Sequence, residues 1–441
     1  MSAPEMGKPI RTASDLIQYQ RTLDCVHCGL CLPACPTYEL LSRESAGPRG
    51  RVYLMRGLAE GEVQPTQSAI RDLDLCLVCR ACEPVCPSGV RFGEMMEFVR
   101  SEVLEPARPS TMGSKIRRLL LSEVVHRPLL LSTLARLVSF YQRSGLRRIL
   151  RRYGVLKYVS EDLHQRDALM PEIPGGRERR RLPAVTQAVS TRRGRVALLE
   201  GCVAPLLLGG INRATVRVLA NQGFEVVIPR KRTCCGALQA HFGALDRARS
   251  LARKTISAFT ELGPVDAVLV NSAGCGAAMK EYGRLLEEGS GISEGEVQGA
   301  VNFGSKVKDV TEFLVEQGIR PPGSVRELTV AYADACHLAH AQGVRAAPRE
   351  MLAAIPGVRL VALDRPDRCC GAGGLFNVLH PREAGMLLEQ RIADLKRSGA
   401  KVLATANPGC NLQWRAGIQR AGLDVEVLHP VELLDRATGP R

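Results

Sequence analysis

Aromatic side chains and long apolar runs are scarce in this sequence. Phe, Trp and Tyr together make up 4% of its 441 residues, and Trp414 is the single tryptophan. Hydrophobic cores must therefore rest on Leu, Val, Ala and Ile. No uninterrupted apolar run approaches the ~20 residues that a membrane-spanning helix needs. A Ser-His-Asp arrangement, a phosphate-binding glycine loop and a flavin fingerprint are also missing, so we assign no catalytic residue to this chain.

Acidic residues are scarce in one segment. The formal net charge of the chain is +15, and between Lys115 and Arg195 there are 19 Lys and Arg against 6 Asp and Glu. The first part of this segment, from Ser114 to about Tyr158, predicts a helix, because apolar residues recur on one face. That face holds Leu130, Leu134, Val138 and Tyr141. A basic amphipathic helix can lie on an anionic membrane surface, dock on an acidic partner or form a solvated linker.

The second part of the basic segment, Pro171 to Gly194, contains Pro-Gly-Gly and the run Arg177 to Arg181, and it predicts a flexible tether. Nucleic acid is not an expected partner, because the segment offers few aromatic side chains for base stacking. The first residues, MSAPEMGKPIR, lack the apolar core of a secretory signal. The expected location is the cytoplasm or the cytoplasmic face of the inner membrane.

Cysteine, by contrast, is abundant, and eight of the sixteen cysteines lie in two copies of the pattern C-x2-C-x2-C-x3-C-P. This pattern is typical of a pair of 4Fe-4S clusters, because three closely spaced thiolates wrap one corner of a cluster and the fourth comes from elsewhere. In proteins with two such runs, the last cysteine usually crosses to the other cluster. The expected ligand sets are Cys25, Cys28, Cys31 and Cys86 for the first cluster, and Cys76, Cys79, Cys82 and Cys35 for the second.

Zinc and disulfides are the competing interpretations of these two runs. Zinc sites use paired C-x2-C halves, in which a third cysteine two residues further on has no role. Disulfides are disfavoured in a chain that stays in a reducing cytoplasm. The two runs therefore favour clusters.

The other eight cysteines form two matched sets. In each set a single cysteine is followed by Cys-Cys-Gly and then by another cysteine, and corresponding positions lie 134 or 135 residues apart, which indicates a duplicated unit. The first set is Cys202, Cys234, Cys235 and Cys275, and the second is Cys336, Cys369, Cys370 and Cys410. Each set could hold a further 4Fe-4S cluster or a zinc ion, could cycle between dithiol and disulfide, or could merely fill space. The glycine after each pair is expected to let backbone approach a bulky inorganic centre.

Strands alternate with helices in both units, which predicts a mostly parallel sheet covered on both faces. Strands are expected at 196–199, 267–270, 328–333 and 401–404. The single cysteines follow these strands, at the carboxyl edge where ligand sites gather in such sheets. The predicted fold is multidomain: an α-helical ferredoxin-type domain with two 4Fe-4S clusters (1–110), a basic helical linker (111–194) and a duplicated α/β cysteine-rich domain (195–320 and 321–441).

Three stretches carry a resemblance to a known family. They are CVHCGLCLPACPTYELL from Cys25, GPRGRVYLMRG from Gly47 and CLVCRACEPVCPSGVRFGEMME from Cys76. Together with the tandem Cys-Cys-Gly units, they resemble the iron-sulfur subunit of glycolate oxidase, and the likeness covers most of the chain. The stretch from Gly50 to Glu60 predicts a helix, as in the helical ferredoxin domain of that family.

The resemblance implies a subunit of an oxidoreductase complex that does not itself bind the substrate. It implies FAD on partner dehydrogenase subunits, electrons passed one at a time toward quinone or another membrane acceptor, and glycolate as the substrate of the complex. Peripheral membrane contact through the basic segment would suit that role. Lactate and glycerol 3-phosphate systems use similar subunits and stay open as alternatives, and so does a heterodisulfide-reductase-like thiol or disulfide activity of the Cys-Cys-Gly units.

The chain departs from the heterodisulfide reductase pattern at one position of each unit. In those relatives the unit closes with C-x2-C, whereas Ser272 and Asn407 occupy the first of these positions here. Hydroxyl and amide groups are poor iron ligands, so the unusual cluster of those relatives is not expected. His337 and His340 are predicted to be structural hydrogen bonders, and His27 to tune the first cluster through its surroundings.

Overall fold

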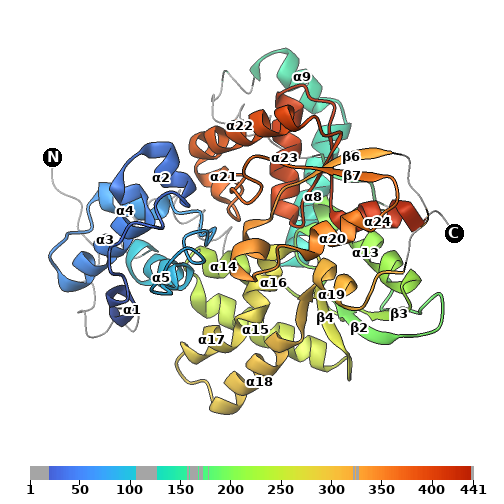
Figure 1. Ribbon diagram of the computed structural model, residues 1–441, viewed down its shortest axis with the longest axis horizontal. Helices are drawn as coiled ribbons and strands as arrows, with labels where there is room; N and C mark the ends of the chain where they lie inside the picture. The colour runs from blue at the N-terminus through green and yellow to red at the C-terminus, as the bar shows by residue number, and fades with distance from the viewer. Residues whose placement is uncertain are drawn as a thin grey trace.

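The computed structural model describes residues 19–105, 127–155, 158, 167, 172–176, 178–320, 323 and 327–438. In Figure 1 a blue helical domain lies beside two larger units, one coloured green to yellow and the other orange to red. Within the described ranges, no helix has both the length and the apolar character needed to cross a membrane.

The N-terminal domain is built from short helices around two cysteine loops. Its helices are α1 (Tyr19–Leu23), α2 (Pro36–Leu41), η2 (Glu44–Ala46), α3 (Pro48–Glu60), α4 (Gln67–Asp74), α5 (Phe92–Val99) and η3 (Arg100–Leu104). Proline at the first turn starts α2 and α3, where its missing N–H costs no hydrogen bond. Left-handed Gly61 ends α3. The predicted helix at 50–60 is thus confirmed, and its Met55 and Leu58 enter a core with Met95 and Met96.

Each Cys-Cys-Gly unit contains one mostly parallel sheet, as expected. In the first unit the strands are β1 (Val185–Thr186), β2 (Gly194–Leu198), β3 (Phe224–Val227), β4 (Ala267–Val270) and β5 (Val307–Asp309), in the order β1-β3-β2-β4-β5. In the second unit they are β6 (Leu328–Tyr332), β7 (Val358–Val361), β8 (Val402–Ala404) and β9 (Glu426–Leu428), in the order β7-β6-β8-β9. Without antiparallel β1, the two orders are the same. The duplication visible in the cysteine spacing is therefore a duplication of the fold.

Helices cover both sheets and also join the units to each other. The first unit contains α12 (Ala204–Leu207), α13 (Gly209–Asn221), α14 (Ala237–His241), α15 (Leu245–Thr260), α16 (Ala273–Lys280), α17 (Tyr282–Glu287), α18 (Glu294–Ser305) and α19 (Val310–Glu316). The second contains η5 (His337–Ala341), α20 (Ala347–Ala353), α21 (Phe376–Leu379), α22 (Pro381–Ser398), α23 (Pro408–Arg420) and α24 (Pro430–Thr438). Helix α13 packs on α24 and α19 on α20, so a single core contains Val196 and Leu269 of one sheet with Val330 and Val402 of the other.

The basic segment is helical, but its described residues form two helices instead of one and bury a different face from the one predicted. Its helices are α8 (Pro128–Arg143) and α9 (Leu146–Arg152), and the expected start at Ser114 lies outside the described residues. Leu130 and Leu134 of the predicted apolar face are exposed, whereas Val138 packs inward beside Leu131 and Ala135. The helix therefore turns a different set of residues toward the protein.

The predicted flexible tether is in large part packed against the first unit. Strand β1 pairs antiparallel with β3 at its edge, and Leu182 is buried in the shared core. The guanidinium of Arg181 donates a hydrogen bond to the carbonyl of Pro229 at 2.6 Å. The Pro-Gly-Gly punctuation indicated irregular backbone correctly, but the contacts made by this backbone come from residues far away in the sequence.

Candidate iron-sulfur and thiol sites

The first cysteine pocket lies at the surface of the N-terminal domain. Cys25, Cys28, Cys31 and Cys86 line a pocket of about 290 Å³ that opens to solvent. Cys28 is exposed and the other three are partly buried. Three cysteines of the first run thus meet the last cysteine of the second run around one space.

The second cysteine pocket lies deeper. Cys35, Cys76, Cys79 and Cys82 line a pocket of about 300 Å³, and all four thiols are buried. Here the last cysteine of the first run meets three cysteines of the second. Four thiols around one space are the donor set of a 4Fe-4S cluster. Within the described ranges, no group of three or more Cys, His, Asp or Glu side chains is arranged to hold a single metal ion.

The two cysteine loops share an unusual backbone conformation. His27 (φ 55°) and Val78 (φ 50°) precede the second cysteine of their runs, and Gly29 (φ 84°) and Arg80 (φ 62°) follow it. A non-glycine residue in this left-handed region costs ~1–3 kcal/mol and persists where the surrounding structure imposes it, often at ligand sites. The turn lets the N–H of Val78 donate to the sulfur of Cys76 at 3.3 Å. Sequence reasoning missed this repeat, and Gly29 was the one residue of the four whose type favours the left-handed region.

Positive charge and spare N–H groups lie beside the thiols. Arg51 is 1% exposed, its Nε donates to the carbonyl of Asp72 at 2.9 Å, and its Nη1 lies 4.0 Å from the sulfur of Cys35. Its Nη2 is buried without a hydrogen-bond partner among the described residues. In the first pocket, burial raises the pKa of the Cys31 thiol to about 11, and the backbone N–H of Arg49 lowers it in part. An unused N–H beside buried thiols fits an anionic thiolate cluster.

The thiols of each Cys-Cys-Gly set lie within hydrogen-bonding range of one another. The contacts run in the same order in both units: Cys202, Cys234, Cys235 and Cys275 in the first, and Cys336, Cys369, Cys370 and Cys410 in the second. The bonds from neighbouring thiols, together with burial, raise the pKa of Cys235 and of Cys370. The same kind of bond lowers the pKa of Cys369.

The glycine after each cysteine pair lies close to the backbone of the following long helix. Gly236 (φ 80°) and Gly371 (φ 87°) are both left-handed. A Cβ at Gly236 would lie 3.2 Å from the carbonyl of Ala248 in α15, and one at Gly371 would lie 2.8 Å from the carbonyl of Ala384 in α22. Both glycines thus allow the following long helix to pack closely, and their expected approach to an inorganic centre stays a prediction.

Ser272 and Asn407, which replace the additional cysteines, face each other between the two units. The hydroxyl of Ser272 donates to Oδ1 of Asn407 at 3.4 Å. Ser272 also hydrogen-bonds Cys275, and Nδ2 of Asn407 donates to the sulfur of Cys410 at 3.4 Å. These two polar side chains therefore form a hydrogen-bonded bridge between the thiol sets.

The second cysteine pocket adjoins the thiols of the second unit. Cys79 packs with Cys369, Leu77 and Phe376 in one buried cluster, with Cys336 at its margin. Burial, and next the nearby thiol of Cys369, raise the pKa of Cys79. The two thiol sites are therefore close enough to affect each other's charge.

Comparisons with known proteins agree with this arrangement. Residues 21–90 match the model of a 4Fe-4S dicluster domain, and 196–280 and 330–415 match that of a cysteine-rich domain. Residues 113–170 match the linker region of the glycolate oxidase iron-sulfur subunit. The "Probable glycolate oxidase iron-sulfur subunit" of Bacillus subtilis is 36% identical over 95% of this chain and 94% of its own length.

The chain belongs to the glycolate oxidase iron-sulfur subunit family. The glycolate oxidase iron-sulfur subunit of Escherichia coli is 31% identical over 94% of this chain and 93% of its own. A subunit of the fumarate reductase (CoM/CoB) of Methanothermobacter marburgensis is 27% identical over 94% of this chain and 72% of its own. The resemblance of the three motifs is thus confirmed, and the chain is an iron-sulfur electron-transfer subunit with a role in an oxidoreductase.

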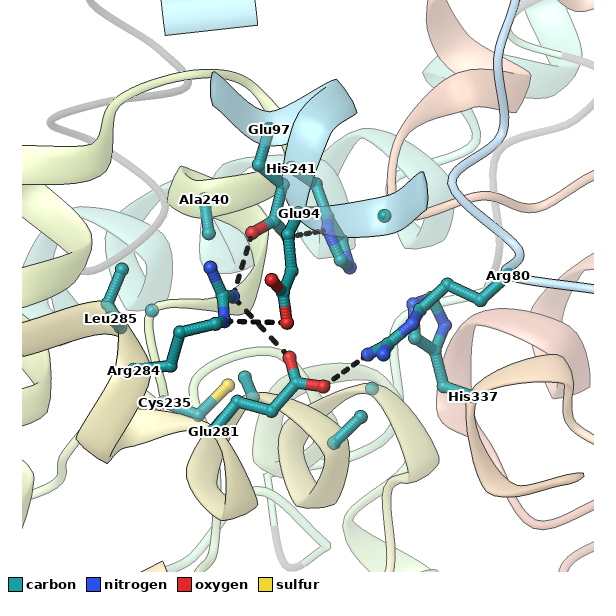
Figure 2. Close-up of a pocket in the computed structure, with 15 residues that line it drawn as sticks. Arg80, Glu94, Glu97, Cys235, Ala240, His241, Glu281, Arg284, Leu285 and His337 are labelled. Carbon is teal, nitrogen blue, oxygen red and sulfur yellow. Dashed lines mark hydrogen bonds and ion pairs between the residues drawn. The ribbon is translucent and has the colours of Figure 1, made fainter. Parts of the chain in front are cut away.

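A charged junction joins the N-terminal domain of this iron-sulfur subunit to its first unit. A pocket of about 480 Å³ lies there. In Figure 2, Glu94 and Glu97 enter it from α5 and Arg284 enters it from α17. The guanidinium of Arg284 lies 3.2 Å from Glu94 and 3.5 Å from Glu97, while Arg80 pairs with Glu281. Burial alone would raise the pKa of Glu97, but the hydrogen bond with His241 and the nearby positive charges lower it to about 2.

The two histidines predicted to be structural, His337 and His340, differ in their contacts. His340 hydrogen-bonds the carbonyl of Asp367 at 3.1 Å and Arg345 at 2.9 Å, which agrees with a structural role. His337 is buried, stacks on His241 with ring centroids 5.0 Å apart, and places Nδ1 3.7 Å from the sulfur of Cys336. Burial lowers the pKa of His337 to about 3, so its ring is neutral at physiological pH.

Proposed function

We propose that this chain is the electron-transfer subunit of a flavin-dependent glycolate dehydrogenase and carries a 4Fe-4S cluster in each four-cysteine pocket. The ligands are Cys25, Cys28, Cys31 and Cys86 in the first pocket and Cys76, Cys79, Cys82 and Cys35 in the second. The observation that carries the proposal is the exchange of the last cysteine between the two pockets. A bound 4Fe-4S cluster accepts and releases one electron at a time. The chain's own residues hold the thiolates and set the charge around them.

The first pocket is the side on which a partner flavoprotein would dock. Large apolar side chains surround it at the surface: Leu23 is 46% exposed, Val26 67%, Leu30 59%, Tyr53 60% and Val85 43%. Val26 and Leu30 belong to the first cysteine loop, and Val85 precedes Cys86. A partner that covers this patch would bury apolar area and approach the exposed Cys28. We place FAD and the substrate site on that partner.

The second pocket leads away from this surface. Cys79 adjoins Cys369 and Cys336, and the bridge of Ser272 and Asn407 leads from the second thiol set to the first. Electrons would thus leave through the Cys-Cys-Gly units toward quinone at the cytoplasmic face of the inner membrane. These units would bind a further cluster or zinc through their eight cysteines, and a cluster is the better fit because no three thiols of the described residues are arranged around one metal ion.

The exchange can be tested with double variants reconstituted anaerobically. The wild type should contain about eight iron and eight sulfide for two clusters. Cys25 and Cys86 line the same pocket, so the double variant Cys25→Ala with Cys86→Ala should lose no more iron than either single variant. Cys25 and Cys35 line different pockets, so the double variant Cys25→Ala with Cys35→Ala should lose nearly all of the iron. The reverse pattern would show that each run binds its own cluster. Iron above eight atoms per wild-type chain, or any bound zinc, would belong to the Cys-Cys-Gly thiols.

The substrate of the complex can be tested with the flavoprotein subunits bound. Glycolate should bleach the visible absorption of the iron-sulfur subunit faster than lactate or glycerol 3-phosphate does. The match of residues 113–170 to the linker of glycolate oxidase subunits favours this outcome. Faster bleaching by lactate or glycerol 3-phosphate would reassign the complex.

A thiol or disulfide activity of the Cys-Cys-Gly units is the second candidate. The lowered pKa of Cys369 favours it, since thiolates are the form that attacks disulfides. Under this alternative, Cys370→Ser would abolish reduction of a disulfide substrate while glycolate-dependent bleaching stays intact. Under the main proposal, the wild type shows no such turnover.

A further inference from the structure

Large apolar side chains are exposed in unusual number on the basic segment. The described residues include nineteen large hydrophobic side chains that are exposed, and nine of them lie between residues 130 and 158. The nine are Leu130, Leu134, Leu137, Phe140, Leu146, Ile149, Tyr153, Val155 and Tyr158. Scattered apolar residues on a surface need no explanation, but a concentrated patch marks an interaction site.

Helix α8 owes this patch to a second apolar face. Its inner face, with Leu131, Ala135 and Val138, packs on Leu206 and Leu207 of α12. Its outer face repeats Leu130, Leu134 and Leu137 at the spacing of helical turns, and these side chains are 43%, 44% and 60% exposed. Phe140 extends the outer face and is 69% exposed. One face thus anchors the helix to the protein, and the other is available for contact.

The charge around this face has one sign. No Asp or Glu occurs between Glu123 and Glu161, whereas Arg127, Arg136, Arg143, Arg147, Arg148, Arg151, Arg152 and Lys157 do. Asp167 pairs with Arg147 and Arg151. Arg136, Arg148 and Arg152 are exposed, and within the described residues they make no ion pair. A surface that covers the outer face would therefore meet these three arginines, which have no ion-pair partner among the described residues.

We propose that the outer face of α8, together with α9, docks on an anionic lipid surface. Arginine side chains can extend to the lipid phosphates while leucine and phenylalanine enter the boundary of the acyl chains. The exposed apolar side chains are spread along two successive helices, which suits the extended surface of a bilayer better than a short peptide. The charge matches the anionic lipids of a cytoplasmic leaflet. The proposal rests on the proposed function at one point: a subunit that passes electrons to quinone must reach the bilayer in which quinone is dissolved.

The test is co-sedimentation of the full-length chain with vesicles of phosphatidylcholine, with and without phosphatidylglycerol. We expect binding only when phosphatidylglycerol is present. The variant Arg148→Gln with Arg152→Gln should bind at least ~10-fold more weakly, because each basic residue near a charged surface contributes about fivefold. The variant Leu137→Ser with Phe140→Ser should lose a similar factor through its apolar contacts.

Two control variants separate a local surface from a general effect. Arg382→Gln with Arg420→Gln makes the same change of net charge at exposed positions of α22 and α23. Val301→Ser with Val378→Ser removes apolar groups that are 48% and 47% exposed elsewhere. Both should bind vesicles as the wild type does. Three results would overturn the proposal. The control variants could lose as much binding as the surface variants, or the wild type could fail to bind. The surface variants could also bind vesicles normally but no longer co-purify with flavoprotein subunits. None of these results bears on the iron content that tests the proposed function.

Discussion

Replacing Arg284 by methionine should loosen the N-terminal domain from the first unit. The guanidinium has 13% of its side-chain surface exposed and pairs with Glu94 and Glu97 at 3.2 and 3.5 Å. At an effective dielectric constant near 20, each pair attracts by about 5 kcal/mol, and burial of the charges offsets much of that. Removing one partner of a buried ionic group costs ~3–5 kcal/mol. We expect about 3 kcal/mol, the lower end, because Arg21 still pairs with Glu94.

Amide hydrogen exchange of α5 measures this loss directly, because it reports the free energy of local opening. A cost of about 3 kcal/mol corresponds to a decrease in protection of about 100-fold. Arg397→Met is the matched control. Its side chain is 61% exposed and pairs with exposed Asp364, and such surface pairs contribute about 0–1 kcal/mol. Protection of α5 should be unchanged in this control.

A double-mutant cycle with Glu97→Gln shows whether the effect arises from the pair. The low pKa of Glu97, about 2, indicates that its carboxylate depends on nearby positive charge. The double variant should therefore lose less protection than the sum of the two single variants, by about 1–3 kcal/mol. Additive effects, or full protection of α5 in Arg284→Met, would refute the reasoning that this buried network holds the domain in place.

Two other predictions concern pH and backbone conformation. Burial raises the pKa of Asp309 from 3.8 to about 6, although Thr311 donates hydrogen bonds that lower it. A raised carboxyl pKa contributes stability at low pH that is lost as pH rises through 6, so between pH 5 and 7 urea denaturation should show the wild type losing about 1 kcal/mol relative to Asp309→Asn. The same change in the free energy of unfolding between pH 5 and 7 in both proteins would contradict this. Gly29→Ala should lower the temperature at which the visible iron-sulfur absorption is lost, because its Cβ would lie 2.8 Å from Nη1 of Arg49 and would displace that group from the carbonyl of His27, to which it donates a hydrogen bond. Gly61→Ala, with a φ of 77° but open space around it, should have a smaller effect.

The features that could be predicted from sequence are those carried by repeated patterns along the chain. Alternating strands and helices specified the parallel sheets, and β4 spans Ala267–Val270 as expected. The cysteine spacing correctly indicated a duplicated fold, because a copied unit keeps its strand order. The grouping of Cys35 with the second run was also expected, because paired runs follow a known exchange. Their role as cluster ligands stays a prediction.

The remaining features depend on contacts between residues far apart in the sequence. Helix α8 has two apolar faces, and the sequence alone does not show which one meets Leu206 of α12. The charged junction brings Glu97 within reach of Arg284, which lies in a different domain. The left-handed turns at Val78 and Arg80 oppose the local preferences of both residues. Tertiary structure imposes all three.

The shared lining of the two cysteine pockets has a consequence for synthesis of the chain. Cys86 belongs to the pocket of Cys25, so no fragment that ends between the two runs has a complete first pocket. The second pocket needs Cys35 as well as Cys82, so it too stays incomplete until the first three cysteines of the second run have left the ribosome. Neither pocket would therefore mature before the second run is synthesised, and a product truncated between the runs would offer the cell's assembly machinery only incomplete sites.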